Sequence, residues 1–309
     1  MKVSFGVASR FLHVDARPVL VRAWQLRSGE VRLRADALHP AKVDCPALLG
    51  AATGGGVASR GHLRIAIERM RFALGIDDDL SDFKRRFRDD PLLGPIIRRR
   101  TGFRPRRRPW PWEALAWAVT NQLIEARRAA QIQRRIVARW GPRAGSGRGA
   151  LRDVPCAGAI AGRAPAELEA LDLANRRAVA LRAVARAVAA GRCDPGDPAG
   201  DERLLAMSNI GPWTIQCLGF FGRGEPHMLP AADLGYIKLV GVLAGMDRRA
   251  TVEEVEEFFA PYAPYQGLAG AYVLSGLHHK VAGSAPLKLV HEPLEPEERG
   301  LPRKTPRRT

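Results

Sequence analysis

The 309-residue chain contains little cysteine, and its few cysteines are far apart. They stand at positions 45, 156, 193 and 217, so no two of them form a CxxC pair. This spacing argues against a zinc site of the usual kind and against an iron–sulfur loop built from one short segment. Nothing in it suggests a disulfide framework, and we expect a protein of the reducing cytoplasm.

Long hydrophobic runs are also missing. No stretch of about 18 uncharged apolar residues occurs, so we expect no membrane span. The first residues, Met1 to Phe5, are not followed by the apolar region of a secretory signal. Hydrophobic residues nevertheless make up 46% of the chain, which is enough for a globular core.

Acidic residues are scarce beside basic ones. The chain has 49 Lys and Arg against 32 Asp and Glu, a net charge of +17, and arginine greatly outnumbers lysine. Such a balance favours a polyanionic partner, of which nucleic acid is the commonest. A merely basic soluble protein is the alternative.

Residues 1–61 predict a small β-containing N-terminal domain. Residues 19–24 and 30–35 are β-leaning runs, and Ser28-Gly29 between them is a hairpin-turn pattern. Residues 62–283 predict an all-α body, because apolar residues recur there at helical spacing, as at Leu63, Ile67, Met70 and Leu74. We expect Gly75 to end the first of these helices as its C-cap. Further helices are expected within residues 81–87, where Ser81 is the expected cap, and within residues 91–97, 112–140, 164–171, 176–190, 201–206, 213–221, 233–243, 252–259 and 267–277. Residues 284–309 are rich in proline and charge, and we expect a basic disordered tail.

The most informative segment is a predicted hairpin between two helices, within residues 204–221. Asn209 and Gly211 flank Ile210, and both residue types tolerate left-handed backbone angles. Pro212 suits the first turn of the second helix, whose amides can then face a phosphate. An ordinary helix–turn–helix packing unit explains the spacing equally well.

This segment resembles the hairpin of the helix-hairpin-helix DNA glycosylase superfamily. The loop 228–235, ending Pro230-Ala231-Ala232-Asp233-Leu234-Gly235, resembles the proline-to-aspartate loop that follows the hairpin in that superfamily. The resemblance covers roughly residues 63–280 and is to 3-methyladenine DNA glycosylase II. It implies a mainly α fold with two helical lobes. Asn209 departs from the family pattern, which prefers glycine there.

By this resemblance, Asp233 is the expected catalytic carboxylate. A capping role alone is the alternative, since Asp is a favoured N-cap, and the two roles are compatible. N-glycosidic cleavage builds positive charge on the sugar, and a fixed anion stabilises that charge. Trp213 stands where bifunctional relatives carry a lysine for Schiff-base chemistry, so the resemblance implies a monofunctional enzyme that uses water.

The expected base pocket holds Trp213, Tyr265, Cys217 and Leu234. An indole face attracts cationic bases such as 3-methyladenine, whereas core packing is the alternative for Trp213. Cys217 and Leu234 replace family tyrosines, and Tyr265 followed by Gln266 replaces tryptophan and arginine, so the substrate range is open.

Asn121-Gln122-Leu123-Ile124 resembles the family loop that interrupts a helix. Leu123 matches the position of an apolar wedge that fills the hole left by a flipped base, and a buried helix leucine is the alternative. The residues expected to bind DNA are Asn209, Ile210, Gly211, Thr214, Gln122, Leu123 and Gln266.

The sequence therefore predicts a monofunctional alkylpurine DNA glycosylase. Its expected partner is double-stranded DNA with damaged bases, and we expect a cytoplasmic, nucleoid-associated monomer. No metal site and no cofactor are expected, although the resemblance implies a monovalent cation at the hairpin carbonyls. Two alternatives stay open: a non-catalytic DNA-binding relative, and a monofunctional glycosylase for another damaged base.

Overall fold

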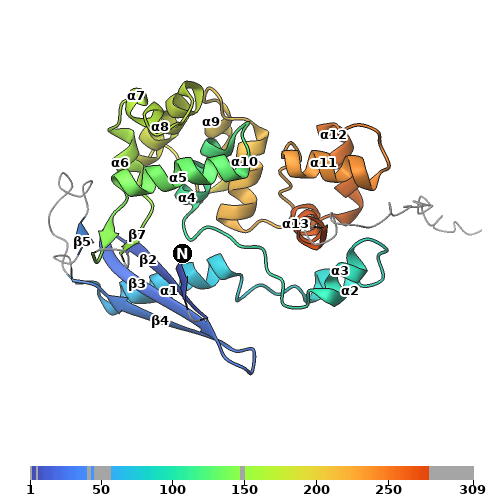
Figure 1. Ribbon diagram of the computed structural model, residues 1–309, viewed down its shortest axis with the longest axis horizontal. Helices are drawn as coiled ribbons and strands as arrows, with labels where there is room; N and C mark the ends of the chain where they lie inside the picture. The colour runs from blue at the N-terminus through green and yellow to red at the C-terminus, as the bar shows by residue number, and fades with distance from the viewer. Residues whose placement is uncertain (1, 5, 40–42, 45–56, 147–149, 278–309) are drawn as a thin grey trace, which may run out of the picture.

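Two helical lobes lie beside a small antiparallel sheet in the computed structural model (Figure 1). The structure describes residues 2–4, 6–39, 43–44, 57–146 and 150–277. The mainly α fold with a small N-terminal β region is confirmed. None of the helices in these ranges combines the length and hydropathy that crossing a bilayer requires. The expected tail, residues 284–309, lies outside the described residues.

The N-terminal sheet has four antiparallel strands in the order β1-β2-β3-β4. They are β1 (Lys2–Ser4), β2 (Val7–Val14), β3 (Arg17–Gln25) and β4 (Val31–Ala37). Helix α1 (Arg60–Leu74) packs on the sheet and buries Ala66 and Met70 against Leu12, Val19 and Val21. Gly75, in the left-handed region at φ 64°, ends the helix as its C-cap.

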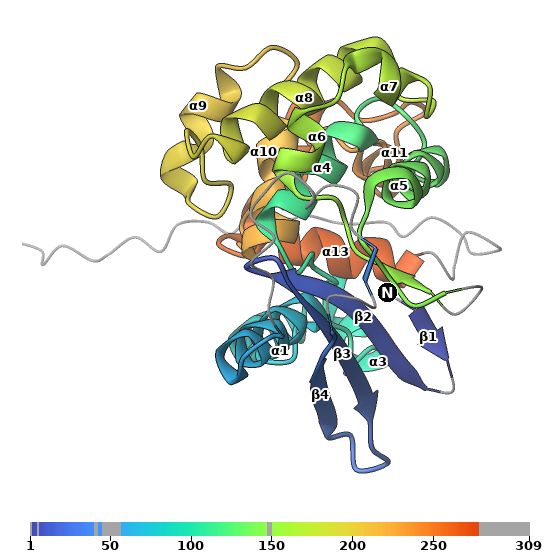
Figure 2. The ribbon, with the colours of Figure 1, turned by 90° about the vertical axis from the view of Figure 1, so that its left-hand side faces the viewer.

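The first lobe (Figure 2, upper half) surrounds the almost wholly buried helix α4. It consists of α4 (Pro111–Asn121), α5 (Ala126–Trp140), α6 (Ala157–Ala161), α7 (Pro165–Glu169), α8 (Asn175–Ala189), α9 (Asp201–Leu205) and α10 (Pro212–Leu218), which a π-helical turn (Gly219–Arg223) extends.

The second lobe combines helices from two distant parts of the chain, as Figure 1 shows. It contains α2 (Ser81–Arg86), α3 (Leu93–Arg99), α11 (Leu234–Leu243), α12 (Val252–Phe259) and α13 (Gln266–Leu277). Aromatic rings from both parts meet in its core, where Phe83 lies 5.1 Å from Tyr272 between ring centroids. This packing joins residues almost 190 positions apart.

A buried ion cluster joins the sheet to the first lobe. Arg10 on β2 donates to Glu113 of α4 at 2.7 Å and to Asp153 at 3.4 Å. The side chains of Glu113 and Asp153 are only 2% and 5% exposed. Burial lowers the pKa of Arg10, but the charges of the two carboxylates more than offset this effect and raise it. His13 on the same strand also contacts Asp153, at 3.2 Å.

The structure differs from the sequence expectations in three local respects. The body is not all-α after residue 62, because β6 (Arg143–Ala144) pairs with β5 (Val43–Asp44) on one side and with β7 (Leu151–Arg152) on the other. Ser81 is the first residue of α2 and not its cap, since Asp79 accepts from the Ser81 amide. Strands β1 and β2 and the short helix α6 were not predicted.

Candidate functional site

The turn between α9 and α10 forms a tight hairpin. Asn209 adopts the left-handed region at φ 64°, as its residue type suggested. Ile210 is buried in the core of the first lobe, and its amide donates to the Met207 carbonyl, so it anchors the turn. A Cβ on Gly211 would meet nothing within 4 Å, so the space in front of this residue is open to an approaching group.

Leu123 is the most exposed large apolar side chain of the described residues, at 104% relative exposure. It lies in the short break between α4 and α5 and has a left-handed backbone at φ 55°. Such a conformation is strained for leucine, and strain of this kind concentrates at functional positions. The buried-leucine alternative is therefore wrong, and the side chain is free to enter a partner.

Gln122 connects this loop to the hairpin. Its amide nitrogen donates to the Asn209 carbonyl at 2.8 Å and to Thr214 Oγ1 at 3.0 Å. Thr214 is only 1% exposed, so its side chain holds Gln122 and does not itself reach the surface. The hairpin turn and Leu123 are consequently fixed relative to each other.

Asp233 is the N-cap of α11, and its Oδ1 accepts from the Gly235 amide at 2.7 Å. The capping expectation is confirmed. The helix amides orient the carboxylate and stabilise its negative charge. Oδ1 is engaged in this way, whereas Oδ2 accepts no hydrogen bond from the described residues and is available for chemistry.

The surroundings of Asp233 come from both lobes. Burial raises the pKa of the Cys217 thiol on α10 well above its usual range, and the negative charge of nearby Asp233 raises this pKa further. The same two causes, in the same order, raise the pKa of Tyr236, which is buried on α11. Asp233 therefore lies where the lobes meet, beside neutral and desolvated groups that strengthen its field.

Seven buried side-chain polar atoms lack a hydrogen-bond partner among the described residues, and two of the seven belong to predicted site residues. These two are Nε1 of Trp213, on the first turn of α10, and Oε1 of Gln266, on the first turn of α13. Unpaired buried polar atoms are rare in native proteins, so each warrants a functional explanation. An indole N–H donor and an amide acceptor suit a polar heterocycle.

Tyr265 and Leu234 lie differently. The Tyr265 hydroxyl donates to Asp82 of α2 at 2.8 Å, and its ring packs against Phe83, so its partners belong to α2. Leu234 is 44% exposed at the start of α11, beside Asp233. The structure thus brings Asp233 and Cys217 together and directs Tyr265 toward α2.

Selective alkylation tests the environment of Cys217. Only a thiolate reacts readily, and burial with the nearby carboxylate keeps the thiol of Cys217 protonated as pH rises through about 8.5, the ordinary thiol pKa. At pH 8, iodoacetamide should label exposed Cys156 and spare Cys217, as read by peptide mass mapping.

Buried Cys193 is the matched control, since burial also raises its pKa. It should stay unlabelled in the native protein, and unfolding in denaturant should open both buried thiols. Labelling of native Cys217 at the rate of Cys156 would contradict the described environment.

Sequence reasoning missed the residues that support the exposed loop. Gln133 on α5 donates to Thr120 Oγ1 at 2.9 Å and to Asn121 Oδ1 at 3.0 Å. Arg177 on α8 donates to the Thr120 carbonyl at 3.1 Å. The Gln133 contacts join α4 to the next helix and the Arg177 contact joins it to α8, 57 residues away, so they depend on how the helices pack and not on a local pattern.

Comparison with known proteins gives a family match. Residues 116–264 match the family described as "HhH-GPD superfamily base excision DNA repair protein". The DNA-3-methyladenine glycosylase of Bacillus subtilis is 26% identical over 209 residues, which are 64% of this chain and 67% of that protein. A probable bifunctional transcriptional activator/DNA repair enzyme AlkA of Mycobacterium tuberculosis is 28% identical over 224 residues, 71% of this chain and 44% of that protein.

Solved structures share the fold at low sequence identity. The 3-methyladenine DNA-glycosylase from Archaeoglobus fulgidus has a TM-score of 0.70 and 19% identity, covering 90% of this chain and 88% of that one. The Clostridium acetobutylicum 8-oxoguanine glycosylase/lyase, solved with double-stranded DNA, has a TM-score of 0.63 and 13% identity, covering 87% and 88%. These similarities extend over both lobes and the N-terminal sheet.

Proposed function

We propose the function of this chain from its family: it belongs to the helix-hairpin-helix superfamily of base excision DNA repair proteins and is a DNA glycosylase of the 3-methyladenine glycosylase type. The proposed reaction is hydrolysis of the N-glycosidic bond of alkylated purines in double-stranded DNA. The proposed substrates are bases of the 3-methyladenine and 7-methylguanine kind. The observation that carries the proposal is Asp233, a helix-capping carboxylate with one free oxygen between the lobes.

In the proposed reaction the damaged nucleotide leaves the helix stack and enters the space beside Asp233. As the glycosidic bond breaks, positive charge grows on the sugar, and the free Oδ2 stabilises it electrostatically. The same oxygen orients the attacking water. Trp213 has no amine, so the sugar forms no Schiff base with this position and the enzyme is monofunctional.

Trp213 supplies the proposed base recognition. A methylated purine of this kind carries positive charge, and the indole face attracts cations. The unpartnered indole N–H gains a hydrogen bond when an acceptor of the base reaches it. Such a base is also a good leaving group, so the site needs little general-acid help.

DNA binding is proposed to use the hairpin and the Gln122–Leu123 loop together. The Asn209–Gly211 turn approaches a phosphate of the backbone, and the exposed Leu123 fills the hole left by the flipped base. The net charge of +17 adds a strong, salt-dependent attraction to the polyanion. A monomer suffices, because both features belong to one chain.

Release of free bases from methylated duplex DNA tests this function. The expected products are 3-methyladenine or 7-methylguanine, identified by chromatography, with no strand cleavage. Release of only deaminated or oxidised bases from matching substrates would instead support the alternative lesion class, which the loss of aromatic side chains at Cys217 and Leu234 favours.

Leu123→Ala tests the wedge. Without the side chain, nothing compensates the unstacking of the duplex, which costs a few kcal/mol, so we expect base release from duplex DNA to slow by roughly ten-fold or more. Release from single-stranded methylated DNA should be unchanged, because that substrate leaves no hole to fill. Single-turnover rates on both substrates measure this difference.

Val242→Ala is the matched control. Val242 is another exposed apolar side chain, 69% exposed near the end of α11, and its loss should leave both rates unchanged. Equal slowing of Leu123→Ala on the two substrates would contradict the wedge and indicate a general packing defect.

A further inference from the structure

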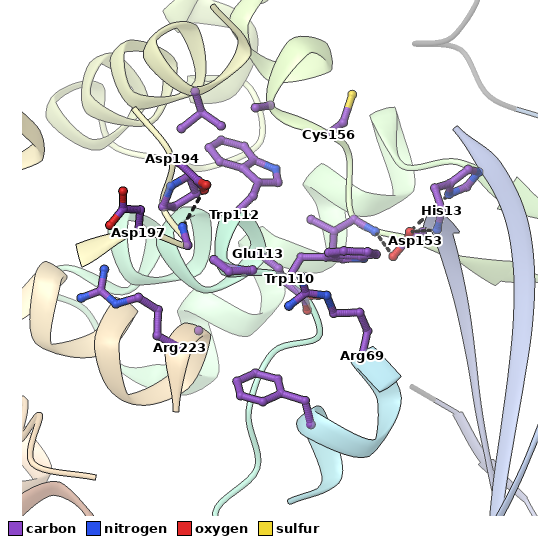
Figure 3. A pocket seen from close by; sticks show the side chains of 18 of the residues that line it. His13, Arg69, Trp110, Trp112, Glu113, Asp153, Cys156, Asp194, Asp197 and Arg223 are labelled. Carbon is purple, nitrogen blue, oxygen red and sulfur yellow. Dashed lines mark hydrogen bonds and ion pairs between the residues drawn. The ribbon is translucent and has the colours of Figure 1, made fainter. Parts of the chain in front are cut away.

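A pocket of about 740 Å³ lies away from the proposed catalytic site (Figure 3). We call it the rear pocket and define it by Arg69 and Phe72 of α1, Trp110 and Trp112 at the start of α4, and Asp194 and Asp197 of the loop before α9. Neither Asp233, nor the hairpin turn, nor Leu123 lines it. Its chemistry therefore calls for a separate explanation.

Helices α4 and α10 place this pocket opposite the hairpin. The C-terminal end of α4 lies beside the N-terminal end of α10, because Gln122 after α4 donates a hydrogen bond to the Asn209 carbonyl before α10. At the opposite ends of the two helices, a Cβ on Gly222 would lie 2.8 Å from the Ala114 side chain. The start of α4 therefore contacts the end of the π-helical turn that extends α10. The two helices thus run antiparallel, and about 15 Å of helix separates the rear pocket from Leu123.

Most charges in the rear pocket are already paired. Arg223 donates to Asp201 and Glu225, and Glu113 and Asp153 hold Arg10. Asp194 and Asp197 differ: among the described residues, one oxygen of Asp194 accepts only from the Gly196 amide, and one oxygen of Asp197 only from the Ala199 amide. Both side chains are exposed at the rim, and their remaining oxygens are free.

The pocket already contains one stacked cation. The guanidinium of Arg69 lies over the Trp110 ring at 4.9 Å from its centroid. No cation from the described part of the chain stacks on Trp112, and its indole N–H donates to the Pro155 carbonyl at 2.9 Å, which fixes the ring. In Figure 3 this ring lies in the pocket beside Asp194. The same pocket is thus lined by a fixed indole and by two carboxylates with free oxygens, and these groups suit a second planar cation.

We propose that the rear pocket binds an arginine side chain from a segment of a partner protein. The guanidinium would stack on Trp112 and donate to Asp194 and Asp197, because arginine combines a planar face with a bidentate fork. The unpaired carboxylates disfavour a phosphate, so the pocket is distinct from the DNA-binding surface. Its position leaves it open while DNA occupies the hairpin; this last point alone rests on the proposed function.

The probe is Nα-acetyl-arginine methylamide, titrated into the full-length protein while the tryptophan indole N–H signals are followed by NMR. Trp112→Phe identifies the Trp112 signal. We expect a saturable shift of that signal with roughly millimolar affinity. The matched citrulline compound has the same shape without the charge and should bind at least about ten-fold more weakly.

Asp194→Asn/Asp197→Asn should weaken arginine binding by about ten-fold or more. Asparagine keeps the acceptor oxygens that bond Gly196 and Ala199, so the loop should hold its conformation, and thermal unfolding measures this. Base release should be unaffected, which separates this proposal from the catalytic one. No saturable shift, equal binding of citrulline, an unaffected double variant, or displacement of the probe by inorganic phosphate would each overturn it.

Discussion

Asp233→Asn is expected to lower the single-turnover rate of base release from methylated duplex DNA by roughly 1000-fold. The substitution removes the negative charge that, in the proposed reaction, stabilises the developing cation on the sugar. Asparagine is as good an N-cap as aspartate, so the Gly235 hydrogen bond and the start of α11 should survive. The DNA affinity and the melting temperature should therefore stay close to those of the unchanged protein.

Asp247→Asn is the control, because Asp247 is an exposed carboxylate in the loop after the same helix. It removes the same charge from the protein without touching the lobe junction, and its rate should be normal. If Asp233→Asn kept a rate within about ten-fold of the unchanged enzyme, Asp233 would be a cap alone and the catalytic assignment would be wrong.

Arg10→Met is expected to lower the free energy of unfolding by about 3–5 kcal/mol. The variant leaves Glu113 and Asp153 as buried carboxylates without their main counterion. Because Arg10 lies on β2 and Glu113 on α4, the loss also loosens the sheet from the first lobe. Chemical denaturation measures the effect, with the Arg10→Met/Glu113→Gln variant expected to recover part of it by removing one unpaired charge.

Arg34→Met is the matched comparison. Arg34 pairs with Asp36 at 2.8 Å, but its side chain is 69% exposed, so water screens the pair. We expect a loss of no more than about 1 kcal/mol. An Arg10→Met cost as small as this would mean that the cluster is well hydrated and does not join the two parts of the molecule.

Sequence patterns predicted most helices, because apolar periodicity and capping residues depend only on neighbours in the chain. Gly75 ends α1 as expected, and Asp233 caps α11, since each depends only on its neighbours. The left-handed conformation of Asn209 followed from its residue type in the same way. The prediction of Ser81 as a cap was wrong: Ser81 is the first residue of α2, and the Asp79 side chain accepts from its amide. Aspartate and serine are both favoured before a helix, so residue preferences alone do not choose between them.

Features that depend on tertiary contacts were not predictable in this way. Leucine is more often buried than exposed, and only the fold shows that Leu123 is exposed. Likewise, the direction of Tyr265 depends on Asp82, 183 residues away. The resemblance to a family supplied the candidate positions, whereas their surroundings came only from the folded chain.

The double hydrogen bond of Gln122 has a consequence for how such a protein searches DNA. In the proposed binding mode, the loop that carries Leu123 stays bonded to the hairpin while the hairpin holds a phosphate, so Leu123 moves together with the turn. At each step along the duplex the Leu123 side chain then contacts the base stack, and this contact slows sliding. Inspection of the bases requires no separate conformational change, and weakly stacked, damaged positions become the places where the moving protein stalls.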